Sequence, residues 1–124
     1  MLITSAFLLI VVGLMHSLLG GKRLIAPLLR RADVPVFLGS IENTRLTLWV
    51  GWHLLTLMFF GQAALLLVIT LSPEDATTAA LITVSFTTGL AGMLALVLTG
   101  GKHCSWLMFL PISVLTGVAA NWMN

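Results

Sequence analysis

The sequence predicts an all-α integral membrane protein, with four transmembrane helices in an antiparallel bundle. Of the 124 residues, 59% are hydrophobic and only 8% are charged, whereas soluble domains carry roughly 25% charged residues. A soluble domain this short could not bury so much apolar surface. The apolar residues also gather in four stretches, each of about the 20 residues that cross the hydrocarbon core of a bilayer.

The four stretches are expected to form helices over residues 2–20, 46–71, 76–99 and 104–123, within a single domain of residues 1–124. A backbone in lipid must satisfy its own hydrogen bonds, and the period-two alternation of a membrane strand is absent, so helices are expected. No basic residue precedes the first stretch, which is therefore interpreted as a retained helix rather than a signal peptide.

Residues between the stretches support these boundaries. Paired glycines at 20–21 and 100–101 are expected to end the first and third helices. The polar pair at 43–44 can cap the second helix, and residues 72–75 (Ser-Pro-Glu-Asp) are a typical helix start. Pro111 is expected to kink the fourth helix.

The basic residues predict the orientation of the chain. Five lie between the first and second helices and one between the third and fourth, which share one side of a four-helix chain: Lys22, Arg23, Arg30, Arg31, Arg45 and Lys102. The positive-inside rule places both loops in the cytoplasm and both termini outside. Residues 22–31 have basic ends around an apolar middle and are expected to lie in the lipid interface. A net charge of +2 does not indicate a nucleic-acid partner.

The three histidines are the candidate functional residues. Counted at about 1.5 Å per residue from the nearest basic residue, His16 and His53 lie at nearly the same depth inside the membrane, and His103 lies at its boundary. Ionisable residues within membrane helices usually face the protein interior. His16 and His53 are therefore expected to face each other or a common cavity. They could hold a metal, haem iron, a quinone or a proton, or could simply make interhelical hydrogen bonds.

Other polar and aromatic residues on the second helix could complete such a site. Arg45, Trp49, His53 and Thr56 recur along one face at helical spacing. Trp49 could cover a ligand beside His53, although an interfacial tryptophan also serves as a membrane anchor.

Small residues indicate where helices pack closely. Such residues, about four positions apart, let two backbones approach. The expected packing residues are Gly13 and Ser17 on the first helix, Ser85, Gly89 and Gly92 on the third, and Gly117 on the fourth.

Three short motifs carry a resemblance. Residues 16–20 read HSxxG, residues 45–53 read RxxxWxxWH and residues 101–106 read GKHxSW. This order resembles a group of small, uncharacterised four-helix proteins of the bacterial inner membrane. The resemblance implies the four-helix fold and no activity. No phosphate-binding loop, nucleophile elbow or HExxH motif occurs, and no carboxylate lies within a predicted span.

Three functions are therefore expected as alternatives. The first is an accessory or structural subunit in a homo-oligomer or a larger membrane complex. The second is a redox protein that binds haem or a metal, or interacts with a quinone, through His16 and His53. The third is a small oligomeric transporter or channel.

Overall fold

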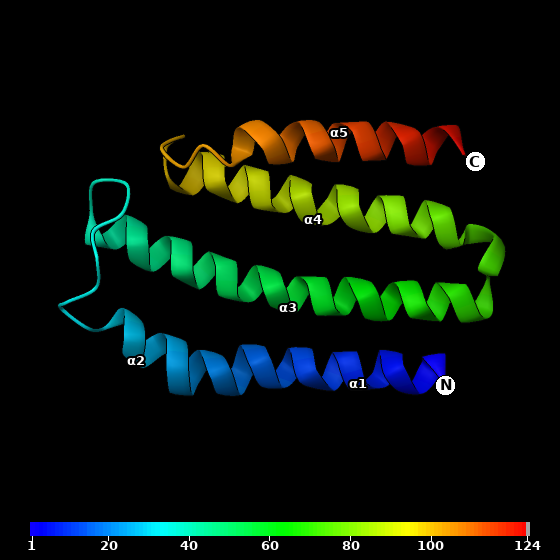
Figure 1. The fold of residues 1–124 in the computed structure, drawn as a ribbon, viewed down its shortest axis with the longest axis horizontal. Helices are drawn as coiled ribbons and strands as arrows, with labels where there is room; N and C mark the ends of the chain where they lie inside the picture. The colour runs from blue at the N-terminus through cyan, green and yellow to red at the C-terminus, as the bar shows by residue number, and fades with distance from the viewer. Residues whose placement is uncertain (124) are drawn as a thin grey trace.

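The computed structural model describes residues 1–123, and their regular secondary structure is helical throughout (Figure 1). Three continuous helices, Leu2–Leu29, Ile41–Leu71 and Pro73–Leu98, are long and apolar enough to cross a membrane. A fourth apolar helix, α5 (Trp106–Trp122), is shorter, with 17 residues. Helix formation by the four apolar stretches is thus confirmed, with three of them of spanning length.

The first helix extends beyond its expected end at residue 20. It consists of α1 (Leu2–Leu14), a π-helix η1 (Met15–Ile25) and α2 (Ala26–Leu29). The two glycines at 20–21 stay helical, and the amide of Ala26 donates to the carbonyl of Gly21, five residues back. The segment expected in the lipid interface therefore begins as the end of a helix.

Helix α3 (Ile41–Leu71) begins ahead of its expected start at residue 46. Ser40 supplies the cap: its backbone is extended and its hydroxyl accepts the amide hydrogen of Asn43, at 3.0 Å. The buried Thr44 then fixes the preceding loop, because its hydroxyl accepts from the amide of Phe37 and donates to the carbonyl of Pro35, both at 2.8 Å.

The remaining connections are short. A single 3-10 turn, η2 (Pro73–Asp75), leads into α4 (Ala76–Leu98). The next turn contains Gly100 and Gly101 at φ values of 58° and 78°, a left-handed conformation that favours glycine. Pro111 lies inside α5, which continues on both sides of it.

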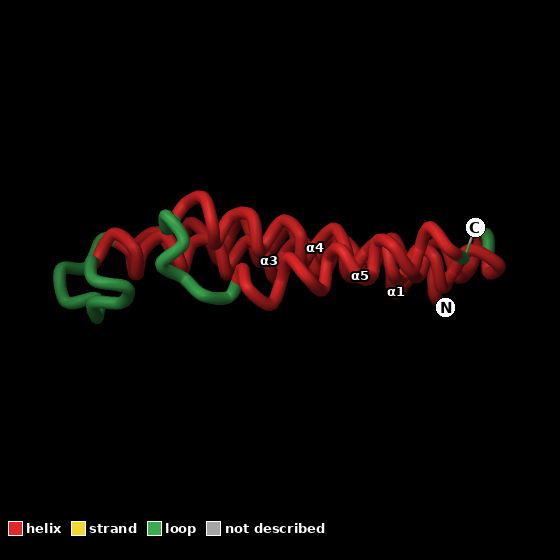
Figure 2. Tube along the Cα trace, turned by 90° about the horizontal axis from the view of Figure 1, so that it is seen from above, coloured by secondary structure: helices red, strands yellow, loops and turns green. Residues whose placement is uncertain are grey.

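The four long helices form a single layer. Extensive contacts join α1 to α3, α3 to α4 and α4 to α5, while α1 and α5 lie at opposite edges (Figure 1). Viewed along the layer, the structure is thin (Figure 2). Most buried apolar residues are alanines at helix contacts, namely Ala6, Ala63, Ala91 and Ala120. A bundle with an enclosed interior is not confirmed.

Candidate functional site

His16 and Trp52 form a reciprocal pair of hydrogen bonds between η1 and α3. The Nε2 of His16 lies 3.2 Å from the backbone carbonyl oxygen of Trp52. In return, the indole Nε1 of Trp52 donates to the backbone carbonyl of His16, at 3.0 Å. A carbonyl oxygen only accepts, so the Nε2 of His16 carries its proton and donates. Each side chain thus binds the backbone of the other helix.

The two rings of this pair also stack. Their centroids lie 3.9 Å apart, with 12° between the ring planes, and Phe59 meets the His16 ring edge-on at 5.8 Å. Gly20 makes this approach possible, because a Cβ there would come within 2.6 Å of the Cζ2 atom of Trp52. We call His16, Gly20 and Trp52 the clasp. It leaves the Nε2 of His16 without a lone pair for a metal.

His53 uses a different partner. Its Nδ1 lies 3.0 Å from the Oγ of Ser17, and Trp49 meets its ring edge-on, with 4.7 Å between centroids. Both histidines therefore lie at the contact between the first helix and α3, at similar depth. Each ring nevertheless has its own partner on the opposite helix, and no hydrogen bond or ring contact joins His16 to His53 within residues 1–123.

A cavity of about 250 Å³ adjoins His53 on the basic side of this contact. Its walls include Ser17, Gly21, Lys22, Trp49 and His53, but not His16. A Cβ at Gly21 would lie 3.9 Å from the Cε1 of His53, an ordinary van der Waals contact. A ligand here would meet one histidine, one hydroxyl and one lysine.

The polar face predicted on the second helix does point at the first helix. Trp49 and His53 belong to this face, and so does Thr56. The Thr56 residue is 5% exposed, and its hydroxyl has no partner in the described part of the chain. Phe60, one turn further, packs over Gly13, where a Cβ would come within 2.6 Å of the ring.

Arg45 and His103 lie away from the clasp. The Nη2 of Arg45 donates to the backbone carbonyl of Arg31 at 3.0 Å, which ties the long loop to α3. His103 follows α4, where its Nδ1 accepts from the amide of Ser105 and Phe37 meets its ring edge-on. Among residues 1–123, no group of three or more His, Cys, Asp or Glu side chains could hold a metal ion.

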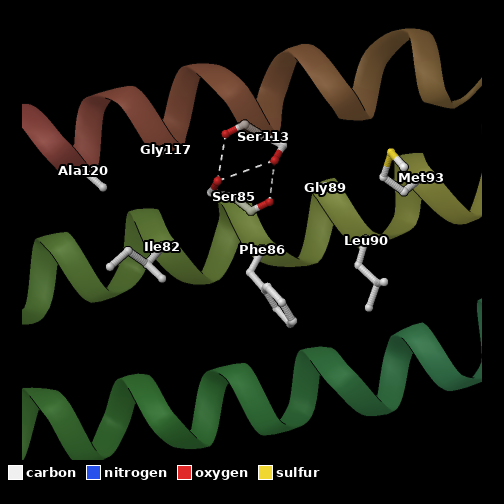
Figure 3. A pocket seen from close by; sticks show the side chains of 9 residues that line it. All are labelled: Ile82, Ser85, Phe86, Gly89, Leu90, Met93, Ser113, Gly117 and Ala120. Carbon is white, nitrogen blue, oxygen red and sulfur yellow. Dashed lines mark hydrogen bonds between the residues drawn. The ribbon is translucent and has the colours of Figure 1, made fainter.

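Helices α4 and α5 are joined by a second reciprocal pair, made of serines (Figure 3). The Ser85 hydroxyl donates to the carbonyl of Ser113 at 2.8 Å, and the Ser113 hydroxyl donates to the carbonyl of Ser85 at 2.7 Å. Gly89 and Gly117 flank the pair, and a Cβ on either would come within 3.0 Å of a serine Oγ. Gly92 similarly lies against Leu110.

Trp52 belongs to the RxxxWxxWH motif, but no role for it was predicted from the sequence. Its neighbour His53 attracted attention because ionisable residues are rare in membrane helices, whereas tryptophan is common at interfaces. The signal that could have predicted its contact is that Trp52 lies at the same depth as Gly20 on the neighbouring helix, where a glycine leaves room for a large ring. No family model, curated protein or solved structure matches this chain.

Proposed function

We propose that the protein is an accessory or structural subunit of a membrane assembly, either a homo-oligomer or a complex with another integral membrane protein. The single-layer arrangement of the helices carries this proposal. Helix association in lipid depends on close packing and interhelical hydrogen bonds. Within a layer one helix thick, each helix packs only against its neighbours on either side. The two broad apolar faces of the layer are therefore free to pack against other membrane helices.

The use of the histidines supports the same function. In the clasp, the imidazole of His16 and the indole of Trp52 are both engaged in joining two helices. Because polar side chains in hydrocarbon are costly unless paired, such bonds fix which helices are neighbours and in what register. In this proposal, His16 joins two helices rather than holding a ligand.

The proposal includes a topology of four spans, with both termini outside and the basic loops in the cytoplasm of a bacterial cell. Supporting this, the loop at residues 30–40 and the turn at 99–105 lie at one end of the layer, and η2 lies at the other (Figure 1). The 17 residues of α5 span about 25 Å at 1.5 Å per residue, somewhat less than the hydrocarbon core.

The test is the size and composition of the particle that is extracted in mild detergent. Native mass spectrometry and light scattering should give a multiple of the 13.3 kDa chain, or a complex with a second integral membrane polypeptide. A monomer without a protein partner, both in detergent and in lipid nanodiscs, would contradict the proposal.

A ligand-binding role at His53 is the second candidate, favoured by the cavity beside its ring. Haem or a metal bound there would have a single histidine ligand, with Ser17 and Lys22 nearby. Absorption spectra and metal analysis of the purified protein, compared with a His53→Ala variant, test this candidate. A Soret band or stoichiometric metal that disappears in the variant would support it, and a colourless, metal-free protein would reject it.

A further inference from the structure

A separate cavity of about 330 Å³ lies between α3 and α4. It shares no lining residue with the cavity at His53. Small residues leave this space open: Gly51 on α3 and Ala91 and Ala95 on α4 all line it, and a Cβ at Gly51 would meet no atom within 4 Å. Because the layer is one helix thick, a cavity between two of its helices borders lipid directly.

The depth of this cavity matches one leaflet of a bilayer. Along α3 its lining residues run from Leu46 to Met58, which corresponds to about 18 Å at 1.5 Å per residue. Half of a hydrocarbon core is about 15 Å. The cavity thus extends from the end of the layer that carries the basic residues to near its middle, and it is apolar over most of that length.

The same end carries donors and positive charge. The Nδ1 of His103 accepts from the amide of Ser105 at 3.3 Å, so in a neutral ring Nε2 carries the proton and is a donor. The exposed Lys102 adjoins His103 in the chain, and Arg45 directly precedes the cavity's first residue on α3. No acidic side chain lines the cavity.

We propose that this cavity binds one acyl chain of an anionic phospholipid from the leaflet on the basic side. The chain lies along α3 and α4, and the phosphate is held near Lys102 and His103. The depth favours a lipid of one leaflet, and the basic residues favour a negative headgroup. The walls are largely aliphatic, with ring side chains only from His103 and Phe109, and so favour an acyl chain over the planar ring of a quinone.

The test measures retained lipid. The full-length protein is reconstituted in nanodiscs of equal parts phosphatidylglycerol and phosphatidylcholine, transferred to mild detergent and analysed by native mass spectrometry. We expect phosphatidylglycerol to be retained in preference. Gly51→Leu fills the cavity and should lower lipid retention by about tenfold. Ala95→Leu narrows the cavity from the side of α4 and should lower retention by about fivefold.

Ala64→Leu is the matched control, because Ala64 is an exposed residue of α3 outside the cavity. It should retain lipid as the unmodified chain does. Equal retention by Gly51→Leu and Ala64→Leu would overturn the proposal, as would equal retention of the two lipids. Ubiquinone in place of phospholipid in protein from native membranes would also overturn it. If Gly51→Leu does not fold, as judged by circular dichroism, the result for Ala95→Leu decides.

Discussion

Adjacent glycines at positions 20 and 21 have different surroundings. A Cβ at Gly20 would come within 2.6 Å of the Trp52 ring, whereas a Cβ at Gly21 would lie 3.9 Å from His53, an ordinary contact. Gly20→Ala should therefore destabilise the protein by about 1–3 kcal/mol through overpacking. Gly21→Ala should be neutral or slightly stabilising, since alanine favours helix. Unfolding by sodium dodecyl sulfate in mixed micelles would separate the two; equal effects would mean that Trp52 does not lie on Gly20.

The clasp also predicts coupling between His16 and Trp52. Trp52→Phe keeps a ring for stacking and removes the bond to the His16 carbonyl, which should cost about 0.5–2 kcal/mol in a membrane protein. His16→Ala removes the other bond and the stacking. Because the two residues share one contact, the effects of the two substitutions should not add. Additive effects on the free energy of unfolding would show that the pair is not in contact.

One titration is expected in the long loop. The Arg31 guanidinium bonds both carboxylate oxygens of Asp33, at 2.8 and 2.6 Å, and lowers the pKa of that carboxyl below its ordinary value. The pair therefore stabilises the loop above the ordinary pKa, and this contribution is lost as pH falls through the lowered pKa. Both side chains are well exposed, so salt should weaken the effect. Nuclear magnetic resonance titration should show the pKa of Asp33 rising in Arg31→Gln, and an unchanged pKa would exclude the pair.

At the level of elements, the contact between α4 and α5 is the most specific. Gly89→Leu should separate these helices, because even a Cβ at Gly89 would come within 2.6 Å of the Ser113 Oγ. Thermal stability in detergent should fall, with Ala64→Leu as a control for an exposed leucine on a helix. An unchanged stability would mean that this face of α4 meets lipid rather than α5.

The helices themselves could be predicted from apolar length, but some of their ends could not. The paired glycines at 100–101 end a helix, because the backbone there is left-handed. The paired glycines at 20–21 remain within a helix, where the absence of a Cβ at Gly20 leaves room for the Trp52 ring. The local sequence is the same in both places, so the difference depends on a tertiary contact. The start of α3 was predicted too late, at residue 46 with a cap at 43–44, because the apolar pattern begins there. The helix begins at Ile41 instead, with Ser40 as its cap.

For the whole molecule, the topology predicts opposite labelling of the two ends of the layer. Single cysteines at Ala32 and Thr77, placed in a Cys104→Ser background, should react with an impermeant reagent from opposite sides of the membrane. In the unmodified chain, the exposed Cys104 provides a separate reference and should be labelled from the same side as Ala32. Labelling of Ala32 and Thr77 from one side would contradict the proposed number of spans.

A layer could not have been told from a bundle by sequence. In a soluble protein the buried face of a helix is apolar and the other face is polar. In lipid, both the protein-facing and the lipid-facing sides are apolar, so Phe86 and Val114, which are exposed, look like interior residues in sequence. The same argument applies to the histidines. Their depth in the membrane could be counted along the chain, but the residue that each one contacts on the neighbouring helix could not be predicted, because both sides of each helix are apolar.

The unequal lengths of the edge helices have a consequence for bilayer thickness. One edge of the layer is the 28-residue helix Leu2–Leu29, and the other is α5, about 25 Å long. The apolar part of the longer helix ends before Lys22 and so matches a hydrocarbon core of about 30 Å, whereas α5 is shorter than the core, so lipid should be thinned beside α5. The protein therefore presents a gradient of hydrophobic mismatch across its width, and neighbours with short membrane spans should gather at its α5 edge.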